Sequence, residues 1–445
     1  MWAIAWVLVR LITGLRRHQP NHQDSDIEKN HSNHPVFRAF FILGFIYLAI
    51  YTTAAIFSID PKLSLGGTNT RQGTLTVFTL VIYSMLVADT VRSFTQADRL
   101  ITGILIGSVP VALYGCLQYI GLDLLRWTTN SLSKVHSTTG YSLFLGAYLA
   151  MVIPFTLARS LDSYRAGKRT RLASYAIILA IQTICLLFTL ARSAVLALLI
   201  GCLIFFMLAV RFRHKWAFVL LTASIVLAGG VILLAINNGW VIIPASQQSR
   251  LSRSLIIETR SLSNLDRLTL WKLTLPLLRR RILLGYGPET YSPAFSQYYQ
   301  TETYPLDTVQ KNPTVLIKKI EYLVYWDPHN LIFAQILSVG VIGLTIFILI
   351  LSLLTLRTFR FIRKESDRSK VIIAAALLGS IAAYIIQAQL NPSGFVPTAI
   401  FWLVIGICAG LPTESPNVET HTFNLIKRSP ASISVSSFLA KFIRT

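Results

Sequence analysis

LIFAQILSVGVIGLTIFILILSLLTL, residues 331–356, carries no charged side chain and is long enough to cross a bilayer as a helix. A hydrocarbon core of ~30 Å is crossed by about 20 apolar residues of α-helix. Nine further runs of this kind are centred near Phe45, Tyr83, Val109, Leu149, Leu179, Phe205, Leu227, Leu378 and Trp402. Only 13% of the 445 residues are charged, against roughly 25% in soluble domains. We therefore predict an all-α, polytopic membrane protein with about ten transmembrane helices.

The net charge of +22 is distributed in a way that indicates membrane topology rather than nucleic-acid binding. Lys and Arg gather in the connections 159–171, 211–215 and 357–370 and in both tails, whereas the alternate short connections contain few of them. By the positive-inside rule, the basic connections face the cytoplasm. We predict that both termini lie inside and that nucleic acid is not a partner.

The predicted spans divide the chain into five segments. A cytoplasmic N-terminal segment (1–35) precedes helices one to seven (36–236), an extracytoplasmic loop (237–329), helices eight to ten (330–411) and a cytoplasmic tail (412–445). Long loops translocate largely regardless of their charge, so the basic residues of the large loop do not contradict this topology.

The large loop is predicted to be partly helical. Its apolar residues recur at helical spacing from Ser249 to Leu278, which indicates an amphipathic helix on the outer membrane surface. We expect this helix to break at Pro276 and to be followed by a turn at Gly285–Pro288. The polar segment Tyr291–Tyr325 predicts a cap over the membrane face. The spacing of Gly285 and Gly287 is also found in phosphate loops, but no βαβ pattern surrounds it, which favours a turn.

His329 is the first candidate for chemistry. It stands in Trp326-Asp327-Pro328-His329-Asn330, directly before an apolar span and on the predicted outer side. The positive end of a helix dipole favours a neutral imidazole, and a neutral imidazole can act as a general base. Asp327 could oppose that effect or orient the ring. The alternative is a histidine that merely caps the helix or binds interfacial water.

Arg192 is the second candidate, because it is a lone arginine in a tight external hairpin. An arginine at a membrane edge commonly reaches for lipid phosphate, which is the alternative explanation. Arg253, Arg260 and Arg267 recur seven residues apart and therefore share one stripe of the predicted loop helix. Guanidinium groups bind phosphate through two parallel hydrogen bonds and stay charged. Such a stripe can equally hold anionic lipid headgroups.

Neither a disulfide framework nor a metal site is indicated. The four cysteines all fall inside predicted helices, at Cys116, Cys185, Cys202 and Cys408, and no spacing suggests metal ligands. The sequence contains no HExxH motif, Walker motif or serine elbow. We expect no metal and no cofactor.

Three blocks, taken in order, resemble the O-antigen ligase and O-antigen polymerase family. They are Thr189–Ala197 around Arg192, Asp266–Pro288 with Arg267 and Trp271, and His329–Leu344, which begins with His329-Asn330. Phe57–Pro61 and Gln118–Asp123 are also similar to members of this group. The likeness spans roughly residues 57–356. Two departures are Ala191, where a serine is usual, and Pro328, where a small residue is usual.

The resemblance implies transfer of a glycan from an undecaprenyl-diphosphate carrier to an acceptor hydroxyl, on the outer face of the bacterial inner membrane and without a metal. Arg192, Arg267 and Arg260 would hold the diphosphate and His329 would be the general base. Asn330, Trp271 and Asp327 would support them. The implied partners are the lipid-linked donor, a glycan or lipid acceptor, and membrane lipids.

Two rival functions remain at this point. A polymerase of the same family would add repeat units to a growing chain, and the sequence does not separate it from a ligase. A transporter, of the kind proposed for inorganic carbon, would place ionisable residues or broken helices near the membrane centre. No Asp or Glu falls in the middle of a predicted span, which favours chemistry at the membrane surface.

Overall fold

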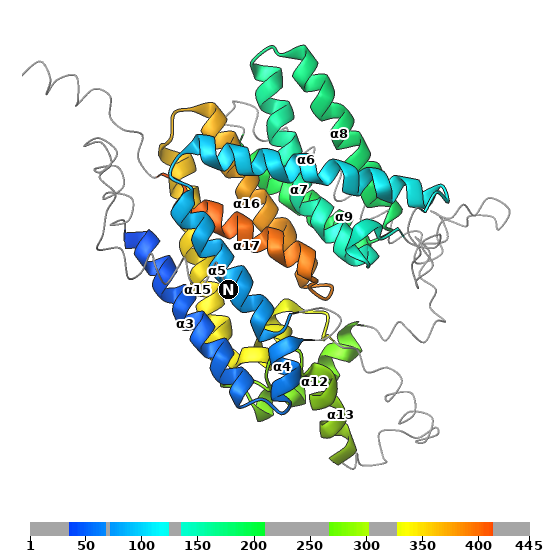
Figure 1. Cartoon of the computed structure of the whole chain (residues 1–445), viewed down its shortest axis with the longest axis vertical. Coiled ribbons are helices and arrows are strands. Elements are labelled where there is room, and N and C mark those ends of the chain that lie inside the picture. The colour runs from blue at the N-terminus through cyan, green and yellow to red at the C-terminus, as the bar shows by residue number, and fades with distance from the viewer. Residues whose placement is uncertain (1–34, 68–71, 124–134, 210–266, 302–326, 413–445) are drawn as a thin grey trace, which may run out of the picture. The chain divides into compact units, whose positions relative to one another are not determined.

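The computed structural model describes residues 35–67, 72–123, 135–209, 267–301 and 327–412. Within these ranges every regular element is a helix and none is a strand, which confirms the predicted all-α class (Figure 1). The apolar run centred near Leu227 and the loop residues before Arg267, Arg260 among them, lie outside the described residues.

Nine of the ten predicted spans correspond to helices. They are α3 (Pro35–Ile56), α5 (Thr74–Thr90), α6 (Phe94–Tyr119), α7 (Ser142–Arg165), α8 (Arg169–Phe188), α9 (Arg192–Ala209), α15 (Leu331–Lys364), α16 (Arg368–Ala388) and α17 (Phe395–Gly410). Seven are long and apolar enough to cross a bilayer, and α5 and α17 are shorter apolar helices. The described part of the chain is therefore a polytopic helical membrane protein.

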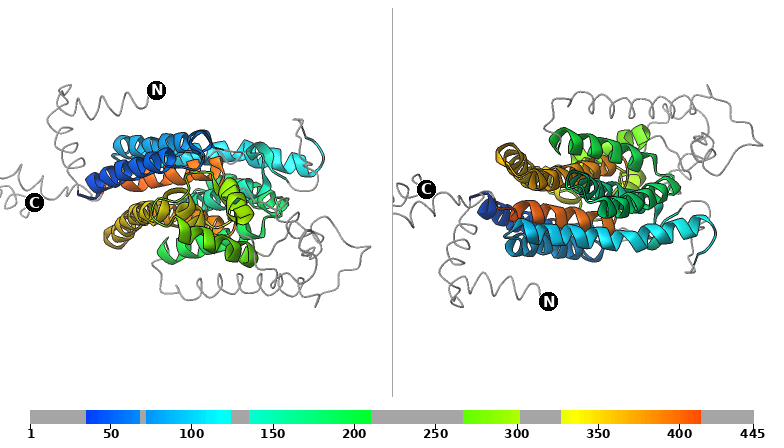
Figure 2. Two further views of the ribbon diagram at one scale, coloured as in Figure 1. Left: turned by 90° about the horizontal axis from the view of Figure 1, so that it is seen from below. Right: turned by 90° about the horizontal axis from the view of Figure 1, so that it is seen from above.

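Helix α16 lies at the centre of the packing and contacts α7, α9, α15 and α17, while α17 also packs on α5 and α15 packs on α3 (Figure 2). Small residues allow a close approach between α9 and α16. A Cβ added to Gly201 would lie 2.7 Å from the carbonyl oxygen of Gly379. Such small-residue contacts are the usual way in which membrane helices pack, because lipid gives little hydrophobic drive for their association.

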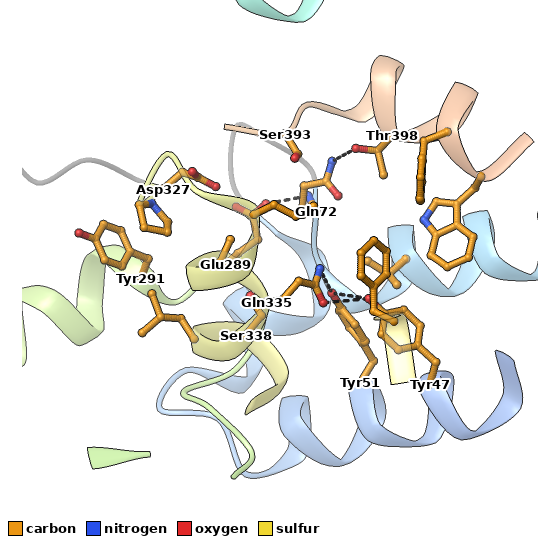
Figure 3. A pocket seen from close by; sticks show the side chains of 18 of the residues that line it. Tyr47, Tyr51, Gln72, Glu289, Tyr291, Asp327, Gln335, Ser338, Ser393 and Thr398 are labelled. Atoms are coloured by element: carbon orange, nitrogen blue, oxygen red, sulfur yellow. Dashed lines mark hydrogen bonds between the residues drawn. The ribbon is translucent and has the colours of Figure 1, made fainter. Parts of the chain in front are cut away.

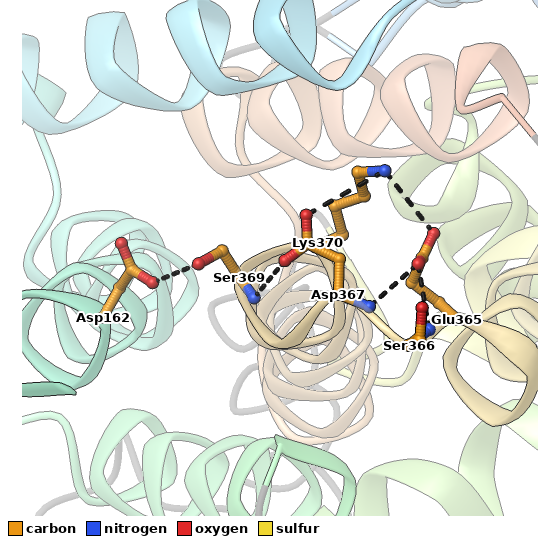
Figure 4. Close-up of polar contacts among 6 residues, drawn as sticks. All are labelled: Asp162, Glu365, Ser366, Asp367, Ser369 and Lys370. Atoms are coloured by element: carbon orange, nitrogen blue, oxygen red, sulfur yellow. Dashed lines mark hydrogen bonds and ion pairs between the residues drawn. The ribbon is translucent and has the colours of Figure 1, made fainter. Parts of the chain in front are cut away.

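One end of the helices is organised by charged groups. Arg159 pairs with Asp98 at 2.6 Å, and Figure 4 shows Ser369 donating to Asp162 at 2.5 Å beside Lys370, which lies 3.8 Å from Glu365. These groups sit where α5 meets α6, α7 meets α8 and α15 meets α16. They belong to the connections that the sequence assigns to the cytoplasm.

At the opposite end, two loop helices, α12 (Arg267–Arg280) and α13 (Tyr291–Thr301), pack against the start of α15. They share a small apolar cluster, here called the loop core, of Leu270, Leu277, Leu278, Tyr286, Tyr291, Ala294, Phe295 and Leu337. Hydrogen bonds reinforce it: the hydroxyls of Thr274 and Tyr291 lie 3.0 Å apart, and Tyr299 donates to the carbonyl of Leu273 at 2.7 Å. The loop core fixes α12 relative to α15.

The predicted break at Pro276 is wrong, because α12 runs through it to Arg280. A proline inside a helix removes the hydrogen bond to the carbonyl four residues earlier. Here that carbonyl belongs to Lys272, an exposed residue, so water can replace the lost donor. The turn at Gly285–Pro288 follows as predicted, with positive φ angles at Gly285 (71°) and Gly287 (109°).

Helix α15 is interrupted at Gly340, whose φ of 70° and ψ of −177° are not helical. The break separates the carbonyl of Leu337 from the amide of Val341, which would otherwise bond to each other. The turn after α12 satisfies both groups: Tyr286 N–H donates to Leu337 O at 2.6 Å, and Val341 N–H donates to Ile282 O at 2.7 Å. The break in α15 thus allows two backbone hydrogen bonds that attach the loop to the membrane helices.

Candidate functional site

His329 lies two residues before α15, in a left-handed conformation with φ 56°. The helix cap is the next residue, since the side chain of Asn330 accepts from Phe333 N–H at 3.1 Å. Asn330 also donates to Gln389 O at 3.5 Å, which ties the cap to the end of α16. Because Asn330 does the capping, the alternative explanation for His329 as a helix cap is wrong.

Asp327 holds His329 in place through two contacts. The backbone N–H of His329 donates to Asp327 Oδ1 at 2.6 Å, and its ring Nδ1 lies 2.8 Å from the carbonyl oxygen of Asp327. A carbonyl oxygen can only accept, so Nδ1 carries the proton and the neutral ring has its lone pair on Nε2. Nε2 is therefore the nitrogen able to take a proton.

Burial lowers the pKa of His329 below the ordinary value for an imidazole, and the positive charge of Arg267 lowers it further. The bond to the Asp327 carbonyl works in the opposite direction. The direction agrees with the neutral imidazole predicted from the sequence, although burial rather than the helix dipole is the largest cause. His329 is consequently uncharged at neutral pH.

Burial also raises the pKa of the Asp327 carboxyl, to about 7, and the nearby Glu289 carboxylate adds to the increase. The hydrogen bond from His329 N–H acts against this rise. Near neutral pH, Asp327 is thus divided between its protonated and ionised forms. No spacing rule pairs Glu289 with Asp327, and sequence reasoning did not select Glu289.

Arg267 begins α12 and reaches the membrane helices through Asn391. Its Nη2 donates to Asn391 Oδ1 at 3.0 Å, and Asn391 Nδ2 in turn donates to the hydroxyl of Ser193. Asn391 is 1% exposed, and it links the start of α12 to the start of α9. Asn391 is not among the residues predicted from the sequence, because it stands before a proline like an ordinary turn residue.

Arg192 opens α9 after the tight hairpin that the sequence predicts. The hairpin is closed by Thr189, whose hydroxyl donates to Leu186 O at 2.6 Å and accepts from Ala191 N–H at 3.3 Å. After burial, the charge of Arg192 is the next cause that lowers the pKa of Arg267. The two guanidinium groups are therefore close enough to repel each other, and the side chain of Asn391 bridges Arg267 to Ser193, the residue after Arg192.

Trp271 lies one turn along α12 from Arg267. Its indole N–H donates to the carbonyl of Pro328 at 3.1 Å, and its ring meets Phe333 edge-on with centroids 6.1 Å apart. Trp271 therefore connects the helix that carries Arg267 to the segment that carries His329. Pro328, the departure from the family pattern, supplies the accepting carbonyl.

Two described loop arginines, Arg280 and Arg281, contact tyrosine rings of the loop instead. Arg280 lies over the ring of Tyr298 at 4.6 Å and Arg281 over that of Tyr286 at 5.3 Å. Arg280 is the last residue of α12, about 20 Å along the helix from Arg267 at 1.5 Å per residue, and Arg281 follows it.

Backbone strain gathers around the same residues. Four non-glycine residues of the described chain have positive φ: Ser137, Leu190, Glu289 and His329. Leu190 precedes Arg192 by two residues, and Glu289 faces Asp327 closely enough to influence its pKa. Strained backbone of this kind persists where the surrounding structure fixes it, often at functional sites. Among the described residues, no three His, Cys, Asp or Glu side chains gather as metal ligands.

The arrangement thus places two guanidinium groups and an uncharged imidazole at one end of the membrane helices. It brings together Arg192, Arg267, Trp271, Asp327, His329 and Asn330 from the sequence prediction, and adds Asn391 and Glu289. Such a group can hold an anion and accept a proton beside it.

A comparison with curated proteins found no match. A family model described as O-antigen ligase matches residues 175–348, the part of the chain that includes α9, α12 and the first half of α15. The match contains Arg192, Arg267 and His329. This part of the chain is therefore similar to the O-antigen ligase family.

Proposed function

We propose that this membrane glycosyltransferase moves a glycan from an undecaprenyl-diphosphate carrier to an acceptor hydroxyl, as an O-antigen ligase does. The observation that carries the proposal is the convergence of His329 with Arg267 and Arg192. The similarity of residues 175–348 to the O-antigen ligase family supports a lipid-linked glycan substrate. The guanidinium groups of Arg192 and Arg267 can bind the diphosphate of that substrate, and His329 can act as the base.

The proposed reaction is a single displacement. The acceptor O–H gives its proton to Nε2 of His329 while the oxygen forms a bond to the anomeric carbon, inverting it. The bond from that carbon to the phosphate oxygen breaks, and its electron pair leaves with the lipid diphosphate. Guanidinium groups fixed before the reaction stabilise this developing charge without reorganising. No metal is required to complete the balance of charge and protons.

Location supports the same proposal. The site lies at the end of the helices opposite to the connections rich in Lys and Arg, such as 159–171. The positive-inside rule assigns that basic end to the cytoplasm. We therefore place the active face outside the bacterial inner membrane, where the lipid carrier presents its assembled glycan.

The break at Gly340 is the observation that a transporter would explain best, because transporters bind substrates at interrupted helices. In such sites the unwound backbone groups ligate the substrate. Here Ile282 and Tyr286 occupy those groups with hydrogen bonds of 2.7 and 2.6 Å. The break is consequently better explained as the place where the loop is attached to α15. We therefore favour a transferase over a transporter.

Purified protein in liposomes containing an undecaprenyl-diphosphate oligosaccharide tests the proposal. We expect transfer to a glycolipid acceptor that persists with a chelator present. Extension of a second lipid-linked oligosaccharide in place of the glycolipid would identify a polymerase. Transfer that stops with the chelator would contradict the metal-free mechanism, and uptake of bicarbonate without any transfer would contradict the enzyme.

Arg267→Ala should lower the transfer rate about 100-fold or more, by analogy with loss of one charge-stabilising donor. Arg267→Lys should recover only part, because an ammonium group cannot form two parallel bonds to the diphosphate and also reach Asn391. Initial rates at varied donor concentration measure both. The matched control is Arg280→Ala, on the same helix but stacked on Tyr298; an equal loss there would remove the assigned role of Arg267.

Trp271→Phe should lower the rate several-fold while changing the donor KM little. The variant keeps the ring that meets Phe333 but loses the donor to the buried carbonyl of Pro328, at about 1 kcal/mol. The segment that presents His329 is then less firmly positioned. Phe333→Leu keeps that hydrogen bond and serves as the comparison. A Trp271→Phe enzyme as fast as the wild type would show that the bond to Pro328 does not position His329.

A further inference from the structure

Helix α12 buries one face and exposes the opposite one. Its buried residues belong to the loop core, on the side where α12 contacts α13 and α15. The other side, here called the outward face, consists of four exposed residues, Leu268, Lys272, Leu275 and Arg279. At about 100° per residue, these four lie within about 60° of one another around the helix axis. Leucines and basic residues therefore alternate along a single exposed stripe.

The outward face combines exposed apolar surface with positive charge. Leu268 and Leu275 are 58% and 42% exposed, so both present apolar surface outside the loop core. The segment 267–288 contains Lys and Arg but neither Asp nor Glu, so the charge of this stretch of sequence has one sign. A helix in which leucines and basic residues share a surface is typical of the membrane interface, where apolar side chains enter lipid and cations meet headgroup phosphates.

The end of α12 lies at the level where α15 enters the hydrocarbon core. Beyond the break at Gly340, residues 341–356 carry no charged side chain and extend about 24 Å at 1.5 Å per residue, close to the ~30 Å of a bilayer core. Gly340 is thus near the outer boundary of that core. The bond from Val341 N–H to Ile282 O fixes the turn after α12 at the same level, and Ile282 and Leu283 are 48% and 61% exposed there. The outward face therefore leads into apolar residues at the membrane surface.

The outward face is separate from the candidate functional site. Arg267 stands five positions before Lys272, which places it about 140° away around the helix axis. Figure 3 shows the cavity beside Asp327, which Gln335 and Ser338 of α15 help to line, and none of the described lining residues belongs to α12. The basic residues of the outward face are consequently not a continuation of the group around Arg267.

We propose that the outward face of α12 binds anionic glycerophospholipids of the outer leaflet. Lys272 and Arg279 contact the headgroup phosphates, and Leu268 and Leu275 enter the upper part of the acyl chains. Basic residues near a membrane surface attract anionic headgroups, and the alternating leucines favour an amphiphile over a soluble anion. The bound lipid holds α12, and with it the loop core, against the membrane. This inference does not depend on transferase chemistry.

Photo-crosslinking tests the proposal on the full-length protein in nanodiscs that contain equal amounts of phosphatidylglycerol and phosphatidylcholine. The photoreactive residue p-benzoylphenylalanine replaces Leu275, and mass spectrometry measures the adducts of each lipid. We expect phosphatidylglycerol adducts to exceed phosphatidylcholine adducts about fivefold or more. The double variant Lys272→Gln/Arg279→Gln should remove this preference, whereas the exchange Lys272→Arg/Arg279→Lys should keep it. Raising the NaCl concentration to about 0.5 M should reduce the preference by screening, and this arm needs no charge variant to fold.

The matched control carries the same photoreactive group in place of Leu113, which is 43% exposed on the membrane helix α6. There the adducts should follow the lipid composition. Equal adducts of the two lipids at position 275, a crosslink to a second copy of the chain instead of lipid, or a preference that survives in Lys272→Gln/Arg279→Gln would overturn the proposal. Loss of the preference on addition of inorganic phosphate would assign the cations to a soluble anion and would also overturn it. Arg267→Ala, which impairs the proposed transfer, should leave the lipid preference unchanged, so the two proposals can fail separately.

Discussion

Replacing His329 with alanine should reduce glycan transfer by about 100- to 10,000-fold, the range associated with loss of a general base. The imidazole is uncharged, and its Nδ1 is occupied by the Asp327 carbonyl at 2.8 Å, so Nε2 is the basic atom. The other histidine of the described residues is His136, whose Nδ1 lies 3.1 Å from the carbonyl oxygen of Ser137. Initial rates in liposomes measure the loss, with membrane insertion checked in parallel.

The pH dependence provides a second measurement of the same role. A base must be deprotonated to act, so activity falls as the pH drops through the pKa of His329. Because burial and Arg267 lower this pKa, the acidic limb should lie below pH of about 6.5, where an ordinary histidine titrates. In Arg267→Gln the repelling charge is gone, the pKa rises, and the remaining activity should fall off at higher pH than in the wild type.

Asp327 affects the same profile in the other direction. Its carboxyl, with a pKa raised to about 7, ionises as the pH rises and then favours a protonated imidazole nearby.

The matched control for His329→Ala is His136→Gln, at the other histidine predicted to face outside, which should retain most of the rate. Comparable losses from His136→Gln and His329→Ala, or an acidic limb that does not move in Arg267→Gln, would contradict the assignment of His329 as the base.

The membrane helices could be predicted from composition because each span is specified locally. About 20 apolar residues in a row have few alternatives to a membrane helix, and nine of the ten runs are helices in the structure. The hairpin before Arg192 was also visible, since two apolar runs meet there with almost no residues between them. Topology then placed His329 and Arg192 on the same side before any contact was known.

The partners of these residues could not be predicted, because they are set by long-range packing. Asn391 bonds Arg267 across 124 positions of sequence, and in the sequence it looks like an ordinary turn residue before proline. Glu289 and Asp327 share no periodic spacing and meet only because the loop core joins α12 and α13 to α15. Sequence periodicity reports on one helix at a time, whereas the site is formed between helices.

The same limitation explains why the position of the helix break was mispredicted. Proline at 276 suggested a break in α12, yet the helix continues there, and the real interruption falls at Gly340 inside an apolar run. By local helix propensity alone, proline at 276 disfavours a helix more than glycine at 340 does. The interruption at Gly340 exists because the turn 282–286 forms hydrogen bonds to the backbone groups of α15 that the break leaves open. These bonds join distant segments, so no local sequence pattern predicts them.

Gly340→Ala should therefore be among the most damaging single changes to stability. Alanine cannot readily adopt a φ of 70° with a ψ of −177°, a region that is essentially restricted to glycine and costs about 1–3 kcal/mol. Its Cβ would also lie 1.8 Å from Leu283 O. The turn must then move away, with loss of two hydrogen bonds at about 1 kcal/mol each. The expected total is about 3–5 kcal/mol, before any further relaxation of the loop core.

The matched control is Gly103→Ala in the middle of α6, where an added Cβ meets nothing within 4 Å. That change should leave stability unchanged or raise it by up to about 1 kcal/mol, because alanine favours a helix more than glycine does. The fraction of protein that remains monodisperse after a heat challenge in detergent measures both variants. A Gly340→Ala protein as resistant as wild type would show that the turn does not depend on the break. A resistant protein that has also lost transfer would mean that Gly340 serves the substrate directly, because the interruption would then matter for binding rather than for anchoring the loop that carries Arg267.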